Sequence, residues 1–269
     1  MKKFLSIILA AMVMTAAGCS KDTDDAAATT TTAAQGDAAA DNSADSDDSA
    51  ADADVETTSV LTEETTAFIE TLKANAPIYA DYMYESGQVP VRNGFTYSAD
   101  LYGTGTPSEV VMEVYMTSLD KIAVKTSTDG VASDIIMKDN TYYIVSAAEK
   151  TAITMALSEE EAAEMADSMA SSMTPAFDAA TATYETGTEE YNGTEYLFEK
   201  INTAEAGQII VYADKDTKEI KYLVSGGIAR EMTFFDHNVD ESVYEVPADY
   251  TITDMSALLA DVEGDAAAE

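Results

Sequence analysis

Cysteine, histidine and tryptophan are almost absent from this sequence, and each absence excludes a class of chemistry. The 269 residues include one cysteine, Cys19, one histidine, His237, and no tryptophan. A single cysteine forms no internal disulfide, so the fold must be stable without covalent cross-links. A single histidine excludes multi-histidine metal sites and leaves Ser-His and Cys-His catalysis without its parts, so we expect His237 to be a surface residue in a loop. The lack of tryptophan removes the usual platform on which sugars stack.

Basic residues are also scarce. The chain has 14 lysines and arginines against 50 aspartates and glutamates, which gives a formal net charge of -36 at pH 7. Such a charge repels DNA, RNA and anionic lipid head groups, so we expect no nucleic-acid partner. The same charge keeps an exported protein soluble.

No catalytic motif is complete. The S-x-x-K spacing of penicillin-binding enzymes occurs at residues 118–121, but its second element, at residues 125–127, lies too close in sequence. Residues 236–240 begin like a calcium-binding loop, yet Glu241 and Pro247 stand where that loop needs glycine and glutamate. Glycine-rich phosphate loops are absent, and no pair of carboxylates stands out among the 50 acidic residues. We therefore expect a protein that is not an enzyme and has no cofactor or metal site.

The N-terminus has the three parts of a bacterial export signal. Two lysines precede an apolar run at residues 4–17, which is too short to span a bilayer as a helix. The run leads into AAGC at residues 16–19, which resembles a lipoprotein box with Ala16 in place of the usual leucine. In such a box the chain is cut before the cysteine, whose thiol carries a diacylglycerol with chains such as palmitate, and two chains give stable anchoring. We expect residues 1–18 to be a lipoprotein signal peptide and Cys19 to anchor the protein outside the cytoplasm, to the bacterial cell membrane.

Composition divides the rest of the chain into three parts. Residues 20–58 are nearly all small or polar, with no aromatic and no large aliphatic side chain before Val55. Such a segment cannot bury enough apolar surface to offset its ordering entropy, so we expect residues 19–59 to be the lipidated cysteine and a disordered tether. Residues 261–269 predict an acidic disordered tail. Residues 60–260 are long enough for a single domain with its own core.

Hydrophobic periodicity predicts two helices that cover the sheet, and a short terminal helix at residues 256–262. The first begins near Thr62, where acidic residues occupy the first turn, and Pro77 either kinks or divides it. The second begins at Ser158, which forms a capping box with Glu161, and extends to Met173.

Alternating apolar and polar residues predict strands in the remainder of the domain. The pairs Asp129-Gly130 and Asn192-Gly193 are strong hairpin signals. Consecutive hairpins favour an antiparallel meander, so the fold class we expect is α+β, mostly β. The sheet should be strongly curved, a half-open barrel of about 10 to 11 strands, covered by the N-terminal helix and the inserted helix.

Methionine is the most informative of the abundant residues. The chain has 13 methionines, and many fall on the predicted inner faces of the strands. Methionine is flexible and lines surfaces that accept variable apolar shapes, but it also serves as adaptable core filling, and both interpretations stay open.

Two phrases carry a resemblance to a known family. "MKDNTYYIVSAAEKTA" and "YEVPADYTITDM", with the order of elements over roughly residues 61–259, resemble the LolA/LppX-like superfamily of bacterial lipoprotein carriers and related lipoproteins. The resemblance implies a curved, half-open antiparallel barrel closed by helices, with an apolar cavity for acyl chains. No binding motif of the family transfers residue by residue, and the fold alone does not establish lipid transport.

Two functions follow as hypotheses. The first is a membrane-anchored, monomeric protein that binds a lipid or another apolar ligand in a non-catalytic cavity, with residues 158–173 as a lid. The candidate cavity residues are Met112, Val114, Met116, Ile135, Met137, Met165, Met169 and Met232. The alternative is a ligand-free cell-envelope interaction or sensor module, in which the same methionines fill the core.

Overall fold

The computed structural model describes residues 55–101, 103, 105–172 and 177–255, with helical side chains up to residue 168. The expected signal peptide, the lipidated Cys19, most of the tether, the short terminal helix and the acidic tail lie outside these residues. The domain boundaries therefore stay predictions.

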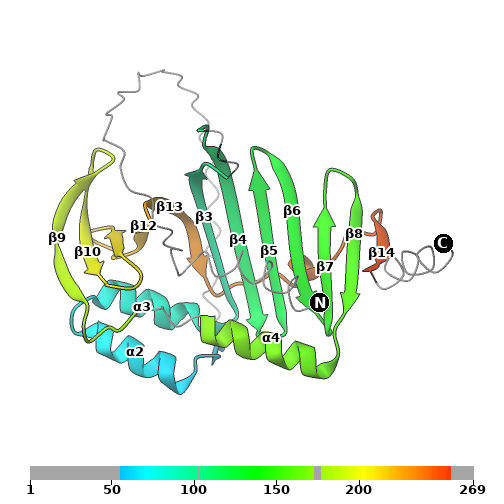
Figure 1. The fold of residues 1–269 in the computed structure, drawn as a ribbon, viewed down its shortest axis with the longest axis horizontal. Helices are drawn as coiled ribbons and strands as arrows, with labels where there is room; N and C mark the ends of the chain where they lie inside the picture. Colours follow the sequence, from blue (N-terminus) through cyan, green and yellow to red (C-terminus); the bar gives the residue numbers. More distant parts are fainter. Residues whose placement is uncertain (1–54, 102, 104, 173–176, 256–269) are drawn as a thin grey trace, which may run out of the picture.

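One twelve-stranded sheet forms the body of the protein (Figure 1). Its order is β14-β8-β7-β6-β5-β4-β3-β13-β12-β11-β10-β9, so most neighbours are consecutive strands joined by hairpins. The sheet is curved and open, with β9 and β14 at its two edges. The predicted fold class, mostly β with a curved antiparallel sheet and covering helices, is confirmed. The strands are β3 (Val91–Ala99), β4 (Ser108–Ser118), β5 (Lys121–Thr128), β6 (Val131–Lys138), β7 (Thr141–Ser146), β8 (Thr151–Ala156), β9 (Thr183–Tyr191), β10 (Thr194–Asn202), β11 (Gln208–Ala213), β12 (Ile220–Ser225), β13 (Ile228–Asp236) and β14 (Thr251–Asp254).

The strand pattern differs from the expected meander in three places. Strand β13 pairs with β3 and joins two meanders, β3–β8 and β9–β13, into one sheet. Strand β14 pairs with β8 in parallel, and β1 (Thr58–Ser59) pairs with β2 (Gln88–Val89) in a separate two-stranded sheet. Hairpin signals predict only pairs that are neighbours in sequence. Strand β14 follows β13 only after residues 237–250, which bring the chain to the edge of the sheet beside β8.

The predicted N-terminal helix is divided into α2 (Glu63–Lys73) and α3 (Pro77–Ser86). Pro77 is the first residue of α3, where a missing N–H and a fixed φ do not weaken a helix. The side chain of Thr62 accepts a hydrogen bond from the backbone N–H of Thr65 at 3.1 Å and caps α2. Both helices pack on one face of β10–β12 and bury Ile69, Leu72, Ala76 and Ala80 against Ile201, Ile209 and Val211.

A buried carboxylate joins α3 to the sheet. Ala76 precedes α3 and has no side chain that could cap it. Glu199 of β10 supplies the acceptors instead, since its two oxygens accept hydrogen bonds from the backbone N–H groups of Ile78 and Tyr79, each at 2.9 Å. Burial raises the pKa of Glu199, while these two hydrogen bonds act in the opposite direction. Strand β10 therefore fixes the start of α3 from 121 residues away.

The inserted helix, α4 (Glu159–Ser172), begins with the predicted capping box. The Glu161 backbone N–H donates to Ser158 Oγ at 3.2 Å, and the Ser158 backbone N–H donates to Glu161 Oε2 at 2.9 Å. These hydrogen bonds lower the pKa of Glu161. In Figure 1, α4 runs from the end of β8 across the strands toward α3.

Residues 237–250 form a strap across the opposite face of β5–β8 before the chain enters β14. The strap contains a 3-10 helix, η1 (Glu241–Tyr244), whose Tyr244 is fully buried against Ala123, Ile136 and Val145. Three lysines of the sheet and its turns form ion pairs with carboxylates of the strap: Lys121 with Glu241, Lys138 with Glu245 at 2.8 Å and Lys150 with Asp249 at 2.7 Å.

Candidate functional site

The face of β3–β8 on which α4 packs, here called the inner face, carries side chains in regular rows, because the pairing register aligns residues across all six strands. Row one is Val91, Met116, Ile122, Met137, Tyr142 and Met155. Row two is Asn93, Val114, Val124, Ile135, Ile144 and Ile153. Row three is Phe95, Met112, Thr126, Ser133, Ser146 and Thr151. Rows one and two form an apolar band, and row three adds hydroxyl groups along its margin.

The inner face of β3–β8 carries no lysine, arginine, aspartate or glutamate, and the structure describes all six strands in full. The charged residues of these strands all lie on the outer face: Arg92, Glu109, Glu113, Lys121, Lys125, Asp134 and Lys138. Burying an unpaired charge is costly, so a charge-free face suits an uncharged apolar ligand.

Burial changes from row one to row two. Row one is buried except for Met155, which is half-buried, and it packs with Met165 of α4. In row two only Val124 is buried, and its other aliphatic members, Val114, Ile135, Ile144 and Ile153, are half-buried. The apolar band is therefore only partly covered by the protein itself.

The described part of the helix over this band buries few side chains. Among the described side chains of α4, residues 159–168, only that of Met165 is buried. By contrast, α2 and α3 bury six residues between them: Thr65, Ile69, Leu72, Tyr79, Ala80 and Met83. A helix with few buried contacts separates from its sheet at a lower free-energy cost than one with many.

Six of the eight candidate residues meet in one apolar cluster. Met116, Met137 and Met165 are buried members of it, and Met112, Val114 and Ile135 pack against it. Met232 does not join the cluster: it lies on β13, pairs with Phe95 of β3 and is half-buried. The side chain of Met169 lies outside the described part of α4. That any of these residues contacts a ligand stays a proposal.

Several residues of the band were not among the candidates. The further apolar members of rows one and two are Val91, Ile122, Val124, Tyr142, Ile144, Ile153 and Met155, and Phe235 of β13 packs at their side. The alternation of apolar and polar residues in the sequence already places these side chains on the inner face. They were not chosen as candidates because the choice favoured methionine.

Tyr142 is the one member of row one with a hydroxyl group. The side chain is 3% exposed, and its Oη atom is buried without a hydrogen-bond partner among the described residues. Burial raises the pKa of this phenol well above its ordinary value. Its neighbours in row one are Met137 and Met155, neither of which offers a good acceptor.

A polar seam separates the apolar band from the core beneath α2 and α3. Tyr82 of α3 lies against Phe235, with ring centroids 5.3 Å apart, and its hydroxyl accepts a hydrogen bond from Asn93 Nδ2 at 2.7 Å. Arg230 is buried near the Tyr97 ring, at 5.8 Å from its centroid, and burial lowers the pKa of its guanidinium. The seam thus separates two apolar regions of the sheet, the band beneath α4 and the core beneath α2 and α3.

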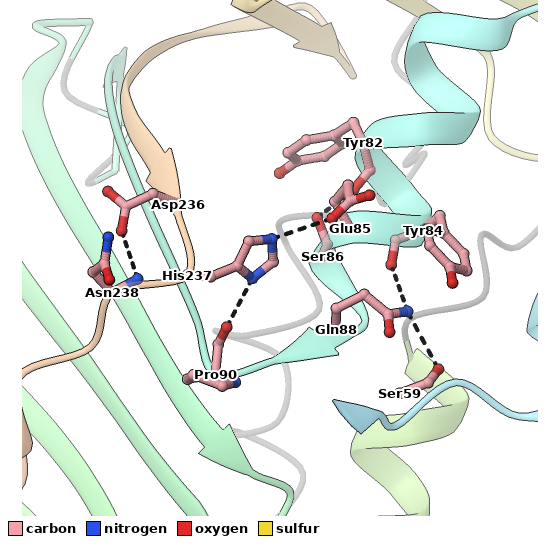
Figure 2. A network of polar contacts seen from close by, with 10 residues as sticks. All are labelled: Ser59, Tyr82, Tyr84, Glu85, Ser86, Gln88, Pro90, Asp236, His237 and Asn238. Atoms are coloured by element: carbon pink, nitrogen blue, oxygen red, sulfur yellow. Dashed lines mark hydrogen bonds and ion pairs between the residues drawn. The ribbon is translucent and has the colours of Figure 1, made fainter. Parts of the chain in front are cut away.

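His237 lies in a bend directly after β13, as expected for a loop residue, but its side chain is half-buried and has contacts on two sides. Its ring is 25% exposed and lies between α3 and the start of β3 (Figure 2). Nδ1 is 2.8 Å from the carbonyl oxygen of Pro90, and Nε2 is 3.2 Å from Glu85 Oε2. His237 joins the end of β13 to α3, so its role among the described contacts is to connect elements.

No known protein family matches the chain, and no curated protein matches it in sequence. Among solved structures the chain is similar to LprF from Mycobacterium bovis, with 9% identity over 72% of this chain and 100% of that one, at a TM-score of 0.36. It is similar to an uncharacterized conserved protein from Thermus thermophilus, with 9% identity over 71% and 99% of the two chains, at a TM-score of 0.36. It is also similar to a LolA superfamily protein from Nitrosomonas europaea, with 7% identity over 58% and 89%, at a TM-score of 0.24. The superfamily that the sequence resembles is thus represented among the similar structures, and scores of this size relate no individual site residues.

Two kinds of feature are absent from the described part of the chain. No helix in it has the length and apolar character needed to cross a membrane. In the same residues, no three acidic, histidine or cysteine side chains are grouped as metal ligands.

Proposed function

We propose that this protein is a membrane-anchored extracytoplasmic lipoprotein that holds a lipid or another apolar ligand on the inner face of β3–β8, without catalysis. The observation that carries the proposal is row two, where four half-buried aliphatic side chains lie on a charge-free face. Covering apolar surface stabilises a complex by about 25 cal/mol per Å² removed from water. An acyl chain that lies along row two covers the apolar surface that these half-buried side chains still expose.

In this proposal α4 acts as the lid. The described part of the helix contacts the band through Met165, its one buried side chain. Met112, Met116 and Met137 belong to the same apolar cluster, and their unbranched side chains adapt to acyl chains of different shape. Met169 and Met232 stay candidate members of the site.

The anchor completes the proposal. Lipidated Cys19 holds the protein at the membrane, and the tether to residue 59 lets the domain reach ligands away from its attachment point. Changing Cys19 to serine is expected to release the protein from the membrane fraction and to leave the circular dichroism of the domain unchanged. Retention in the membrane fraction after this change contradicts the anchoring.

The binding proposal is tested on the mature protein without its anchor. Native mass spectrometry, lipid extraction and uptake of a fluorescent fatty acid should each detect a bound acyl chain in the purified protein. The variant Ile135→Glu puts a carboxylate into row two and should abolish uptake. Val131→Glu, at the exposed end of the same strand, is the matched control and should bind like the wild type.

The alternative function makes a different prediction for the same samples. A ligand-free envelope module with a filled core contains no extractable lipid and takes up no fatty acid. That outcome in a folded wild-type sample rejects the binding proposal.

A further inference from the structure

The hydroxyl of Tyr142 is a buried polar group for which the described structure supplies no partner. The side chain lies in row one of the inner face, is 3% exposed, and has no hydrogen bond at Oη. Buried polar groups are nearly always hydrogen-bonded, and each exception needs an explanation. A phenylalanine would fill nearly the same volume without this cost, so packing does not explain the hydroxyl.

The neighbouring residue in the strand shows that the orientation matters. Tyr143 lies on the outer face, where it packs beside the strap with Tyr244. Tyr142 instead faces the apolar band, in the same cluster as Met137, Met155 and Met165. Its side chain therefore rises from the same face of the sheet on which the proposed ligand lies, one row away from row two.

We propose that Tyr142 is a specificity-determining residue whose hydroxyl donates a hydrogen bond to a carbonyl oxygen of the bound ligand. The inference rests on the proposed function, because it places an acyl ligand on the inner face. A carbonyl oxygen is the acceptor that an acyl chain brings with it. The site therefore prefers an acyl compound to a plain hydrocarbon of the same length.

The charges around the site decide between two kinds of acyl compound. A free fatty acid is ionised at neutral pH, and the inner face of β3–β8 has no cation to pair with its carboxylate. The buried cation nearest to this face in sheet order is Arg230 of β13, which lies by the Tyr97 ring, whereas Tyr142 is on β7. The lysines of β5 and β6 all lie on the outer face. Because an unpaired buried carboxylate costs much more than a buried ester, the site takes an esterified, uncharged acyl group.

The experiment compares three probes against three proteins by NMR of 13C-labelled methionine methyl groups. The probes are methyl palmitate, palmitate and hexadecane, delivered from cyclodextrin. The proteins are the wild type, Tyr142→Phe and the matched control Tyr143→Phe. In the wild type, methyl palmitate should bind more tightly than palmitate, and both should shift the methionines of the inner face.

The variant Tyr142→Phe should lose about tenfold in affinity for methyl palmitate, which corresponds to about 1.4 kcal/mol, and should bind hexadecane as the wild type does. Its ligand-free form should melt at a higher temperature, because a buried hydroxyl without a partner has been removed. Tyr143→Phe should bind all three probes like the wild type.

The outcomes separate this inference from the proposed function. Suppose that the wild type binds the probes. If Tyr142→Phe then has the wild-type affinity for methyl palmitate, or if its affinity for hexadecane falls as much as its affinity for methyl palmitate, the role of the hydroxyl is rejected and the proposed function stands. If palmitate binds more tightly than its ester, the preference for an uncharged group is rejected. If no probe shifts any methionine of the folded wild type, both proposals fail.

Discussion

The two halves of the curved sheet, β3–β8 and β9–β13, are covered in different ways. Over β10–β12, helices α2 and α3 bury Ile201, Ile209 and Val211 almost completely, and Glu199 caps α3 from the sheet. Over β3–β8, α4 is attached through Met165, and row two stays half-buried. The half beneath α2 and α3 is a closed core, whereas the half beneath α4 keeps apolar side chains that the protein covers only in part. In the proposed function, the closed core stabilises the fold and the partly covered half binds the ligand.

The largest expected effect comes from removing the same side chain in each half. Ile201→Ala, beneath α2 and α3, should lower the free energy of unfolding by about 2–5 kcal/mol, because it leaves a cavity in a closed core. Ile144→Ala in row two should cost about half as much, since the side chain is already partly in contact with solvent. Urea denaturation of both variants measures the difference, and equal losses would remove the contrast between the two halves.

The buried carboxylate gives the second effect. Glu199→Leu leaves two N–H groups of α3 without acceptors and should cost about 1–3 kcal/mol for each N–H group that stays buried. Asp81→Leu on the surface of α3 is the control and should change the unfolding midpoint little. A stable Glu199→Leu protein would show that the capping hydrogen bonds do not hold α3.

Two carboxylates in different parts of the sheet should give pH dependences of opposite sign. The pKa of Glu199 is raised above its ordinary value of 4.5 by burial, so the folded state binds this proton more tightly than the unfolded state. Its contribution to stability therefore increases as the pH falls toward 4.5. For Asp236 of β13, burial alone would raise the pKa, but hydrogen bonds from Arg92 and from the Asn238 backbone hold it below its ordinary value of 3.8.

The folded state therefore binds the Asp236 proton less tightly than the unfolded state does. Its stabilising contribution is complete above pH 3.8 and is lost as the pH falls through the lowered pKa. Unfolding curves of Glu199→Gln and Asp236→Asn, each compared with the wild type from neutral to acidic pH, measure the two signs. The same sign in both variants contradicts this assignment.

The attachment of α4 gives a smaller and more local effect. Met165→Ala removes the buried contact between α4 and the apolar band and should raise amide hydrogen exchange in residues 159–168. Exchange in α2 and α3 should not change. Met165→Leu keeps an apolar side chain of similar size and is the control. Faster exchange across the whole sheet would mean that α4 is part of the global fold and not a separate lid.

The smallest effect is expected from the helix start. Ser158→Ala removes one side of the capping box and should destabilise α4 by about 1 kcal/mol. The increase in exchange should be confined to the first turn of α4. Ala156→Ser, which ends β8 on an exposed position, is the control outside the cap.

Local signals predicted most of the fold, and long-range contacts account for what they missed. The alternation of β4 to β7, the hairpin at Asp129-Gly130 and the capping box at Ser158 all appear as expected, because each depends on neighbours in sequence. The parallel pairing of β14 and the capping of α3 by Glu199 depend on residues about 100 or more positions apart, and no local pattern reports them.

The candidate site shows the same division. Alternation placed Met112, Val114, Met116, Ile135 and Met137 on one face, and the register brings them together. The degree of burial could not be predicted, since it depends on where α4 lies over the sheet. For this reason the unpartnered hydroxyl of Tyr142 became visible only in the structure.

The central claim is that an apolar ligand binds in the partly covered half and not in the closed core. Methionine methyl groups report on both. Met116 and Met137 belong to the apolar band and Met165 of α4 packs on it, whereas Met83 of α3 lies in the core that α2 and α3 form with β10–β12. Titration of the 13C-methyl-labelled protein with methyl palmitate should shift the first three signals in proportion to one another and leave Met83 in place. Shifts at Met83 alone, or none at saturating ligand, would contradict the account.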